Sequence, residues 1–154
     1  GLKWTKNVNR QDGKDWAYQN ISNEYPHMDI DLKIFGLHWK TGQEKNAKKP
    51  QEGELIILRQ QTKVTHIVKL LNNSLREISP NPGFECFRLV EVIWMVDNWD
   101  SPPKETTVFD RKINFPPNGN VHELINVKDF QNRWGNDEEG LKNFQKHIKA
   151  ILKK

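Results

Sequence analysis

Five histidines and one cysteine are the chain's candidates for catalysis or metal binding, and their spacing favours neither. No two histidines stand at a separation typical of metal ligands. The carboxylates do not form the cluster that would hold Mg²⁺ in a nuclease. Motifs of phosphate-binding loops, dinucleotide-binding folds, serine hydrolases and zinc proteases are missing from the sequence. We therefore expect no catalytic residue, no metal site and no cofactor, and a protein that is not an enzyme.

His66 is the histidine whose position most invites a function, because it lies in the strand-like segment KVTHIVKLL. Alternation along this segment places Val64, His66, Val68 and Leu70 on one face. A buried histidine, bonded to backbone or to a neighbouring polar group, is one interpretation. The alternatives are a ring in the wall of a ligand pocket and a general base. Catalysis has the least support of the three, and we expect Cys86 to be a small buried apolar residue.

Six tryptophans are the other candidate binding groups. Trp4, Trp94 and Trp134 are expected to fill the core. The remaining three lie beside polar loops, where aromatic rings are often half exposed: Trp16, Trp39 and Trp99. Such rings can stack on a nucleobase, which contributes about 1 to 3 kcal/mol per base. We expect these three rings and His66 to border a base pocket; rings that merely cover the ends of the fold are the alternative.

Positive charge is concentrated in one part of the chain, although the formal net charge is only +4. Residues 40–63 carry six cationic side chains against three acidic ones. The six cationic residues are Lys40, Lys45, Lys48, Lys49, Arg59 and Lys63. A local basic patch favours an anionic partner such as DNA or RNA, contacted through its phosphates. A solvated loop without a partner is the alternative interpretation.

Length and composition indicate a single compact domain over residues 1–154, long enough to bury a core of its own. The single cysteine excludes an internal disulfide and fits a reducing compartment, so we expect a cytoplasmic protein. No segment has the roughly 20 apolar residues of a membrane span. Because Gly1 is a residue that tag removal leaves behind, we consider a domain excised from a longer protein, with a fused effector domain.

Hydrophobic periodicity predicts strands first and helices last. Strands are predicted at residues 28–39, 54–59, 64–71, 86–96 and 106–115, with a hairpin turn at 60–63. A short helix or turn is expected within 15–22 and a polar loop at 40–51. Two C-terminal helices are predicted, with caps at Asn126 and Asn136. The expected fold class is α+β, with a small, curled, mostly antiparallel sheet and flanking short helices.

The order of these features resembles the PUA-like superfamily, and within it the EVE and YTH-like domains. Five stretches in a matching core from about residue 28 to about residue 130 carry the resemblance: GLHWK, PQEGELIILRQ, KVTHIVKLL, FRLVEVIWMV and ELINVKDFQ. Glu54 stands where the family usually has Asp, and Thr65 and His66 replace a step that usually contains glycine. The resemblance implies a pseudo-barrel that binds nucleic acid, often a modified base flipped into an aromatic cage. It places Trp39 and the surroundings of His66 in the pocket.

We therefore expect a non-enzymatic module that binds DNA or RNA and recognises a base, modified in some cases. The alternative is a module that binds a protein partner or regulates an attached effector. A small hydrolase built on His66 is the third hypothesis. Convergent aromatic rings would favour the first, an exposed apolar patch the second, and a carboxylate or thiol beside His66 the third.

Overall fold

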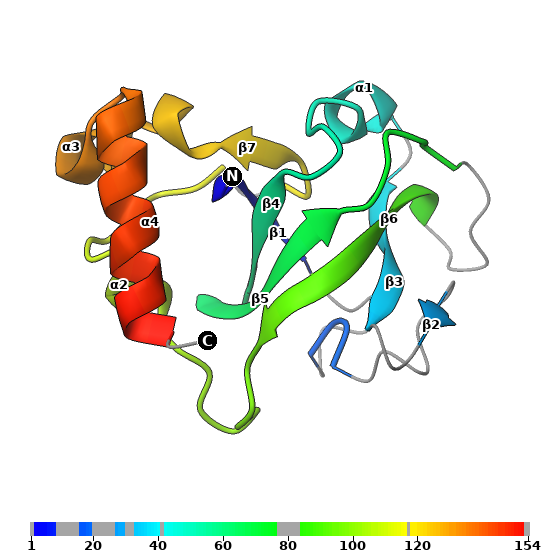
Figure 1. Cartoon of the computed structure of the whole chain (residues 1–154), viewed down its shortest axis with the longest axis horizontal. Coiled ribbons are helices and arrows are strands. Elements are labelled where there is room, and N and C mark those ends of the chain that lie inside the picture. Colours follow the sequence, from blue (N-terminus) through cyan, green and yellow to red (C-terminus); the bar gives the residue numbers. More distant parts are fainter. Residues whose placement is uncertain are drawn as a thin grey trace.

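Seven strands form one strongly curled mixed sheet in the computed structural model (Figure 1). The structure describes residues 2–8, 16–19, 27–29, 33–40, 42–76, 84–116 and 118–152. The strands are β1 (Leu2–Asn7), β2 (His27–Asp29), β3 (Ile34–Lys40), β4 (Leu55–Gln60), β5 (Lys63–Leu70), β6 (Phe84–Met95) and β7 (Val121–Glu123). Their order across the sheet is β2-β3-β6-β5-β4-β1-β7. Only the β1–β4 pair among them is parallel.

The prediction of a small, curled, mostly antiparallel α+β fold is confirmed. The hairpin β4–β5 and the long strand β6 lie where the sequence predicts them. Residues 28–39, predicted as one strand, instead contain parts of the antiparallel strands β2 and β3. The strand predicted at 106–115 is wrong, because this segment starts within α2 (Glu105–Val108) and continues without regular structure. Its apolar side chains are buried against the helices, which is why they resemble a strand pattern; they are Val108, Phe109 and Ile113.

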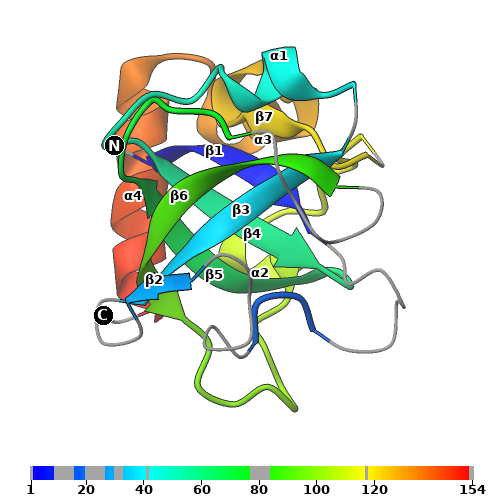
Figure 2. The same ribbon diagram turned by 90° about the vertical axis from the view of Figure 1, so that its right-hand side faces the viewer.

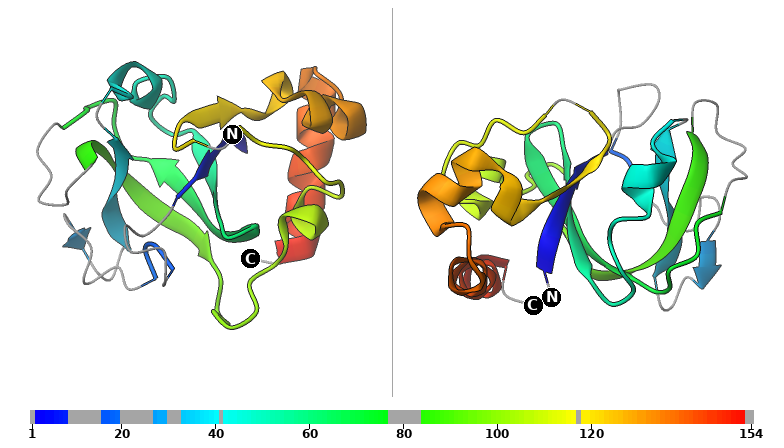
Figure 3. Two further views of the ribbon diagram at one scale, coloured as in Figure 1. Left: turned by 180° about the vertical axis from the view of Figure 1, so that it is seen from behind. Right: turned by 90° about the horizontal axis from the view of Figure 1, so that it is seen from above.

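Helices flank the sheet mainly on one side, as Figures 1 and 3 show. The single turn α1 (Glu44–Ala47) interrupts the predicted polar loop, and the 3₁₀ turn η2 (Leu124–Asn126) leads into α3 (Lys128–Trp134) and α4 (Glu138–Leu152). The two C-terminal helices are confirmed, but not their predicted caps. Val127 occupies the N-cap of α3 without a side-chain bond. At α4, the Asp137 side chain accepts from the backbone N–H of Gly140 at 2.9 Å.

Two core clusters lie on the two faces of the sheet. The first fills the inside of the curl (Figure 2), with Phe35, Leu58 and Val90 among its fully buried members. The second lies between the outer face and the helices, where Phe109 stacks on Phe144 with ring centroids 5.4 Å apart. Strand β4 is buried on both faces, because alternate residues enter alternate clusters. Both cores therefore depend on this one strand.

A bulge in the hairpin changes which face each residue takes. Leu58 pairs with His66 and Arg59 pairs with Val64, so Thr65 is the extra residue between the two pairs. Val64 consequently belongs to the outer cluster, and its predicted place on the face of His66 is wrong. The predicted inward face of His66 with Val68 and Leu70 is confirmed.

Asn46 of α1 closes the open side of the curl between β3 and β7. Its Oδ1 accepts from the Trp39 Nε1–H at 3.0 Å and from the Val121 backbone N–H at 2.6 Å. Its Nδ2 donates to the Val121 carbonyl at 2.9 Å. The amide therefore pairs with Val121 as a neighbouring strand would, and it joins the edge strand β7 to the end of β3.

Because α3 and α4 are in close contact at Gly140, we expect a larger residue at this position to destabilise the fold. A Cβ at Gly140 would lie 1.9 Å from the backbone carbonyl oxygen of Trp134. We expect Gly140→Ala to destabilise the protein by about 1 to 3 kcal/mol in urea unfolding, although alanine ordinarily favours a helix. Gly119→Ala is the matched control, because its Cβ would meet other atoms at 3.5 Å or more. Equal stability of the two variants would contradict the predicted overlap.

Candidate functional site

His66 belongs to a chain of hydrogen bonds that ties residues 17–18 to the hairpin. The Gln60 side chain accepts from the Ala17 N–H at 2.6 Å and donates to the Ala17 carbonyl at 3.0 Å. The same amide donates to the Thr65 hydroxyl at 2.9 Å, which lies 2.9 Å from His66 Nδ1. His66 Nε2 lies 3.0 Å from the Tyr18 carbonyl oxygen. The carbonyl can only accept, so Nε2 carries the proton and Nδ1 accepts from Thr65.

Burial keeps this imidazole neutral. His66 has no exposed surface, and its burial lowers the pKa to about 4 despite the favourable bond to Tyr18. Its partners are a hydroxyl and a carbonyl rather than the carboxylate or thiol that a hydrolase would place there. The expectation of a buried, hydrogen-bonded histidine is confirmed.

Three of the four residues predicted for a base pocket lie together. The Trp99 ring centroid is 5.6 Å from that of His66 and 6.0 Å from that of Trp16. The two indole rings are tilted by 48° and both are partly exposed. Stacked bases lie about 3.4 Å apart, so a base held between two parallel rings needs about 7 Å between them. In this arrangement a base can stack on the outer face of one indole but does not fit between the two.

Trp39 differs from the expectation, because it is fully buried rather than half exposed. Its indole N–H is bonded to Asn46, and the Lys6 ammonium lies 5.0 Å from its ring centroid. Lys6 also donates to the Gly119 carbonyl at 2.6 Å, and burial lowers its pKa to about 7. Trp39 thus helps to close the curl, and its ring offers no stacking face at the surface.

Arg59 and Lys63 line a cleft of about 680 Å³ on the outer side of the hairpin. Lys104 and Lys112 also line it, and Glu105 is the one carboxylate among its described lining residues. The cleft walls come from β1, the hairpin turn and residues 104–116, so distant segments assemble it. We call it the Arg59 cleft.

Arg59 is 3% exposed, although the sequence predicts a residue of the basic surface patch. Its Nε donates to the Thr5 hydroxyl at 2.8 Å, and the Phe115 ring centroid lies 3.7 Å from its Cζ. Nη1 is 3.5 Å from Glu105 Oε1, which is a long contact. Burial lowers the pKa of Arg59 to about 10 and raises that of Glu105, so the pair does not fully offset its loss of hydration. Nη2 is buried and has no hydrogen-bond partner among the described residues.

A second cleft of about 450 Å³ adjoins the first, since Asn114 and Pro116 line both. Its lining includes two lysines, one glutamate and four asparagines: Lys49, Lys128, Glu123, Asn46, Asn114, Asn120 and Asn126. His122 also lines it, and its pKa is lowered by burial first and then by the positive charges of Arg59, Lys49 and Lys6. These positive charges make the electrostatic potential at this surface positive. We call this second cleft the Asn120 cleft.

The predicted basic residues divide between the clefts and the surface around α1. Lys40, Lys45 and Lys48 are exposed near this helix, whereas Lys49 lines the Asn120 cleft. Sequence reasoning missed three exposed lysines that line the clefts: Lys104, Lys112 and Lys128. No local pattern marks them, because the clefts form only when segments far apart in the chain come together.

In comparisons with protein-family models, curated proteins and solved structures, nothing matched this chain. Among the residues that the structure describes, no three His, Cys, Asp or Glu side chains are placed to hold a metal ion. Within that same part of the chain, every helix is too short or too polar to cross a membrane.

The buried imidazole predicts a specific loss of stability in acid. His66 has a pKa of about 4 when folded and about 6.5 when unfolded, so between these values the unfolded chain binds more protons. Its contribution is complete above pH 6.5 and is lost as the pH falls toward 4, by roughly 3 kcal/mol. Urea unfolding at pH 7 and at pH 4.5 should show that the stability advantage of the wild type over His66→Gln shrinks. A His66 ring that titrates near pH 6.5 by NMR would contradict the assignment.

Proposed function

We propose that this chain is a nucleic-acid-binding module, in which the two adjoining clefts contact the phosphate backbone and one indole of the Trp16–Trp99 pair stacks on a base. The ligand class is DNA or RNA, with modified bases included. The proposal assigns no chemical step to any residue.

The observation that carries the proposal is the charge along the joined clefts. Among the residues that the structure describes, six cationic side chains line them against two carboxylates: Arg59, Lys63, Lys104, Lys112, Lys49 and Lys128 against Glu105 and Glu123. The excess of +4 on this one surface equals the formal net charge of the whole chain. Cations that follow a groove attract the regularly spaced phosphates of a strand.

Two short connections along the chain link the aromatic pair to this groove. Consecutive residues of β4 serve both places, because Arg59 lines the cleft while Gln60 holds the segment that follows Trp16. Trp99 and Lys104 belong to one loop, and the backbone of Lys104 pairs with that of Lys63 in an isolated antiparallel β-bridge. Adjacent chain segments thus join the Arg59 cleft to the exposed indoles, while Arg59 and Gln60 themselves belong to opposite faces of β4.

The resemblance to PUA-like domains supports the same proposal. A protein-interaction module, the alternative, has no specific observation in its favour. Among the described residues, Ile93 is the one large apolar side chain with high exposure, at 47%. A lone exposed aliphatic side chain is ordinary for a protein surface.

Neutralising the cleft lysines tests the phosphate contacts. We expect Lys63→Gln, Lys104→Gln and Lys112→Gln combined to weaken binding of a single-stranded oligonucleotide by about tenfold or more at low salt. The slope of log affinity against log salt should fall by roughly 0.7 per lost contact. Fluorescence anisotropy with DNA and RNA strands, plain and methylated, measures both quantities.

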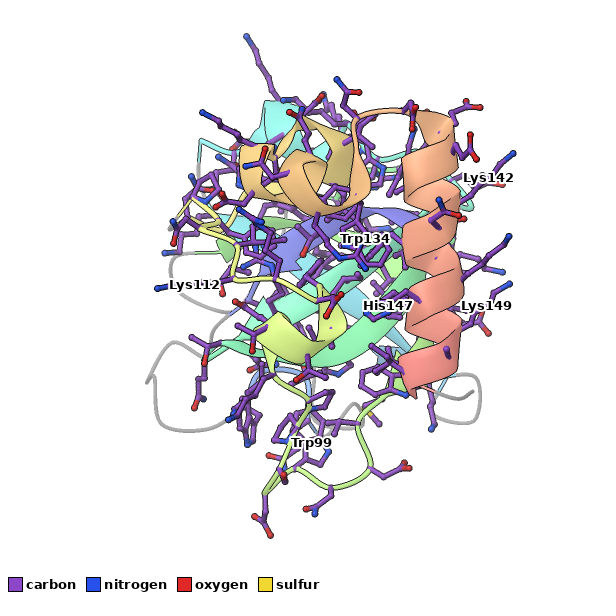
Figure 4. The ribbon with its side chains drawn as sticks, turned by 90° about the vertical axis from the view of Figure 1, so that its left-hand side faces the viewer. Trp99, Lys112, Trp134, Lys142, His147 and Lys149 are labelled. Atoms are coloured by element: carbon purple, nitrogen blue, oxygen red, sulfur yellow. The ribbon has the colours of Figure 1, made fainter. Side chains whose placement is uncertain are left out.

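The control carries the same change of charge on another face. Lys142, Lys146 and Lys149 are exposed on α4, and Figure 4 shows Lys142 and Lys149 pointing outward on the side opposite Lys112. Their replacement by Gln should leave affinity and salt slope almost unchanged. Equal effects of both triple variants would contradict a defined groove, and no binding to any strand at low salt would contradict the proposal itself.

Stacking on Trp99 predicts a different signature. Trp99→Leu keeps an apolar side chain but removes the π face, so affinity should fall by about 1 to 3 kcal/mol while the salt slope stays constant. Any preference between plain and methylated strands should shrink in this variant. Unchanged affinity would exclude Trp99 as the stacking residue and leave the phosphate groove intact.

A further inference from the structure

The geometry points to the Arg59 guanidinium as a phosphate-binding site at the floor of the Arg59 cleft. Its ligand is a phosphate group of an internal diester or of a strand end or nucleotide. The inference deepens the proposed function by naming the group that meets the phosphate.

The donors of the Arg59 guanidinium are unequally engaged. Thr5 occupies Nε, and the Thr5 hydroxyl itself donates to the Ile57 carbonyl at 3.0 Å, so this side of the fork is fixed within the sheet. The outer edge, Nη1 and Nη2, is barely engaged: Nη1 has one contact at 3.5 Å, and Nη2 has no partner among the described residues. Two parallel N–H groups on one edge match two oxygens of a phosphate.

Leaving this edge of the guanidinium unpaired costs free energy. A buried charged group requires partners for its donors, and one long contact to Glu105 does not supply them. The lowered pKa of Arg59 and the raised pKa of Glu105 have the same cause, which is burial that their attraction does not offset. An anion bound between the Arg59 guanidinium and the cleft lysines would supply the acceptors that Nη1 and Nη2 lack.

The surroundings of the guanidinium are also suited to an anion. Lys63, Lys104 and Lys112 line the same cleft, so a phosphate at Arg59 would lie among three further cations and one carboxylate. Phe115 stacks on the guanidinium and holds its plane, which leaves the edge as the side for ligand binding. Because Nη2 is shielded from solvent, the cleft wall must shift locally as the anion enters.

Titration with inorganic phosphate, in a buffer free of other oxyanions, tests the site directly. We expect the ¹⁵N and ¹H signals of the Arg59 guanidinium to shift on titration, and those of Arg133, exposed on α3, to stay constant. The wild-type protein suffices for this measurement, so it does not depend on any variant folding. Phosphate binding without a shift at Arg59 would overturn the inference, as would no phosphate binding.

Two variants change the site in opposite directions. Arg59→Lys keeps the charge but loses the bidentate pair of N–H donors, and should weaken phosphate binding by about tenfold or more. Glu105→Gln removes the competing carboxylate and should tighten it severalfold. Lys142→Gln on α4 is the control with no expected effect. If Arg59→Lys does not fold, Lys104→Gln with Lys112→Gln, both exposed, should still weaken binding.

The source of the phosphate follows from oligonucleotides with and without a 5′-phosphate. If the phosphorylated strand binds more tightly and Arg59→Lys removes this difference, the phosphate is that of a strand end or nucleotide. If both strands bind equally and Arg59→Lys weakens both to the same extent, the phosphate is an internal diester. Oligonucleotide binding unaffected by Arg59→Lys would overturn this inference and leave the proposed function standing. Phosphate binding at Arg59 without binding of any oligonucleotide would contradict the proposed function and leave the phosphate site standing.

Discussion

Burial of strand β4 on both faces is the constraint on which the rest of the molecule depends. From Ile56 to Gln60 every side chain is at most 3% exposed, so each polar one must find partners inside the protein. Gln60 finds them in the aromatic segment on one face, and Arg59 finds only some of them on the other. The same strand pairs with β1 and β5 and contributes to both cores. The parts of the candidate site formed by Arg59 and Gln60 thus arise because these polar residues lie in a strand that is covered on both faces.

The sequence predicts what local periodicity determines. The β4–β5 hairpin, strand β6, the two C-terminal helices and the inward face of His66 follow from residues that are neighbours in the chain. Strand β1 gives no such signal, because four of the six residues of LKWTKN are polar and two consecutive ones are nevertheless buried: Thr5 is bonded to Ile57 and Lys6 to Gly119. These partners lie far along the chain, so no window of sequence reveals them.

The candidate site was predictable in its residue types and only partly in its arrangement. Trp16, Trp99 and His66 do come together, since the same hydrogen-bonded hairpin holds them. Trp39 does not, because the Asn46 amide and the Lys6 ammonium cover a ring whose strand-end position suggests exposure. Three cleft lysines lie beyond residue 100, in segments that the sequence predicts as a loop, a strand and a helix, without any cluster of positive charge. Charge clusters in space therefore differ from charge clusters along the chain.

Cys86 gives the molecule an internal reporter for the opening of its sheet. This sole cysteine of the sequence is fully buried, pairs with Trp39 across β3 and β6, and its thiol lies 3.8 Å from the Trp39 carbonyl oxygen. A reagent that modifies thiols can reach it only when these strands separate or the chain unfolds. The part of the modification rate in native buffer that exceeds the rate expected from global unfolding therefore measures how often this part of the sheet opens, without any engineered label.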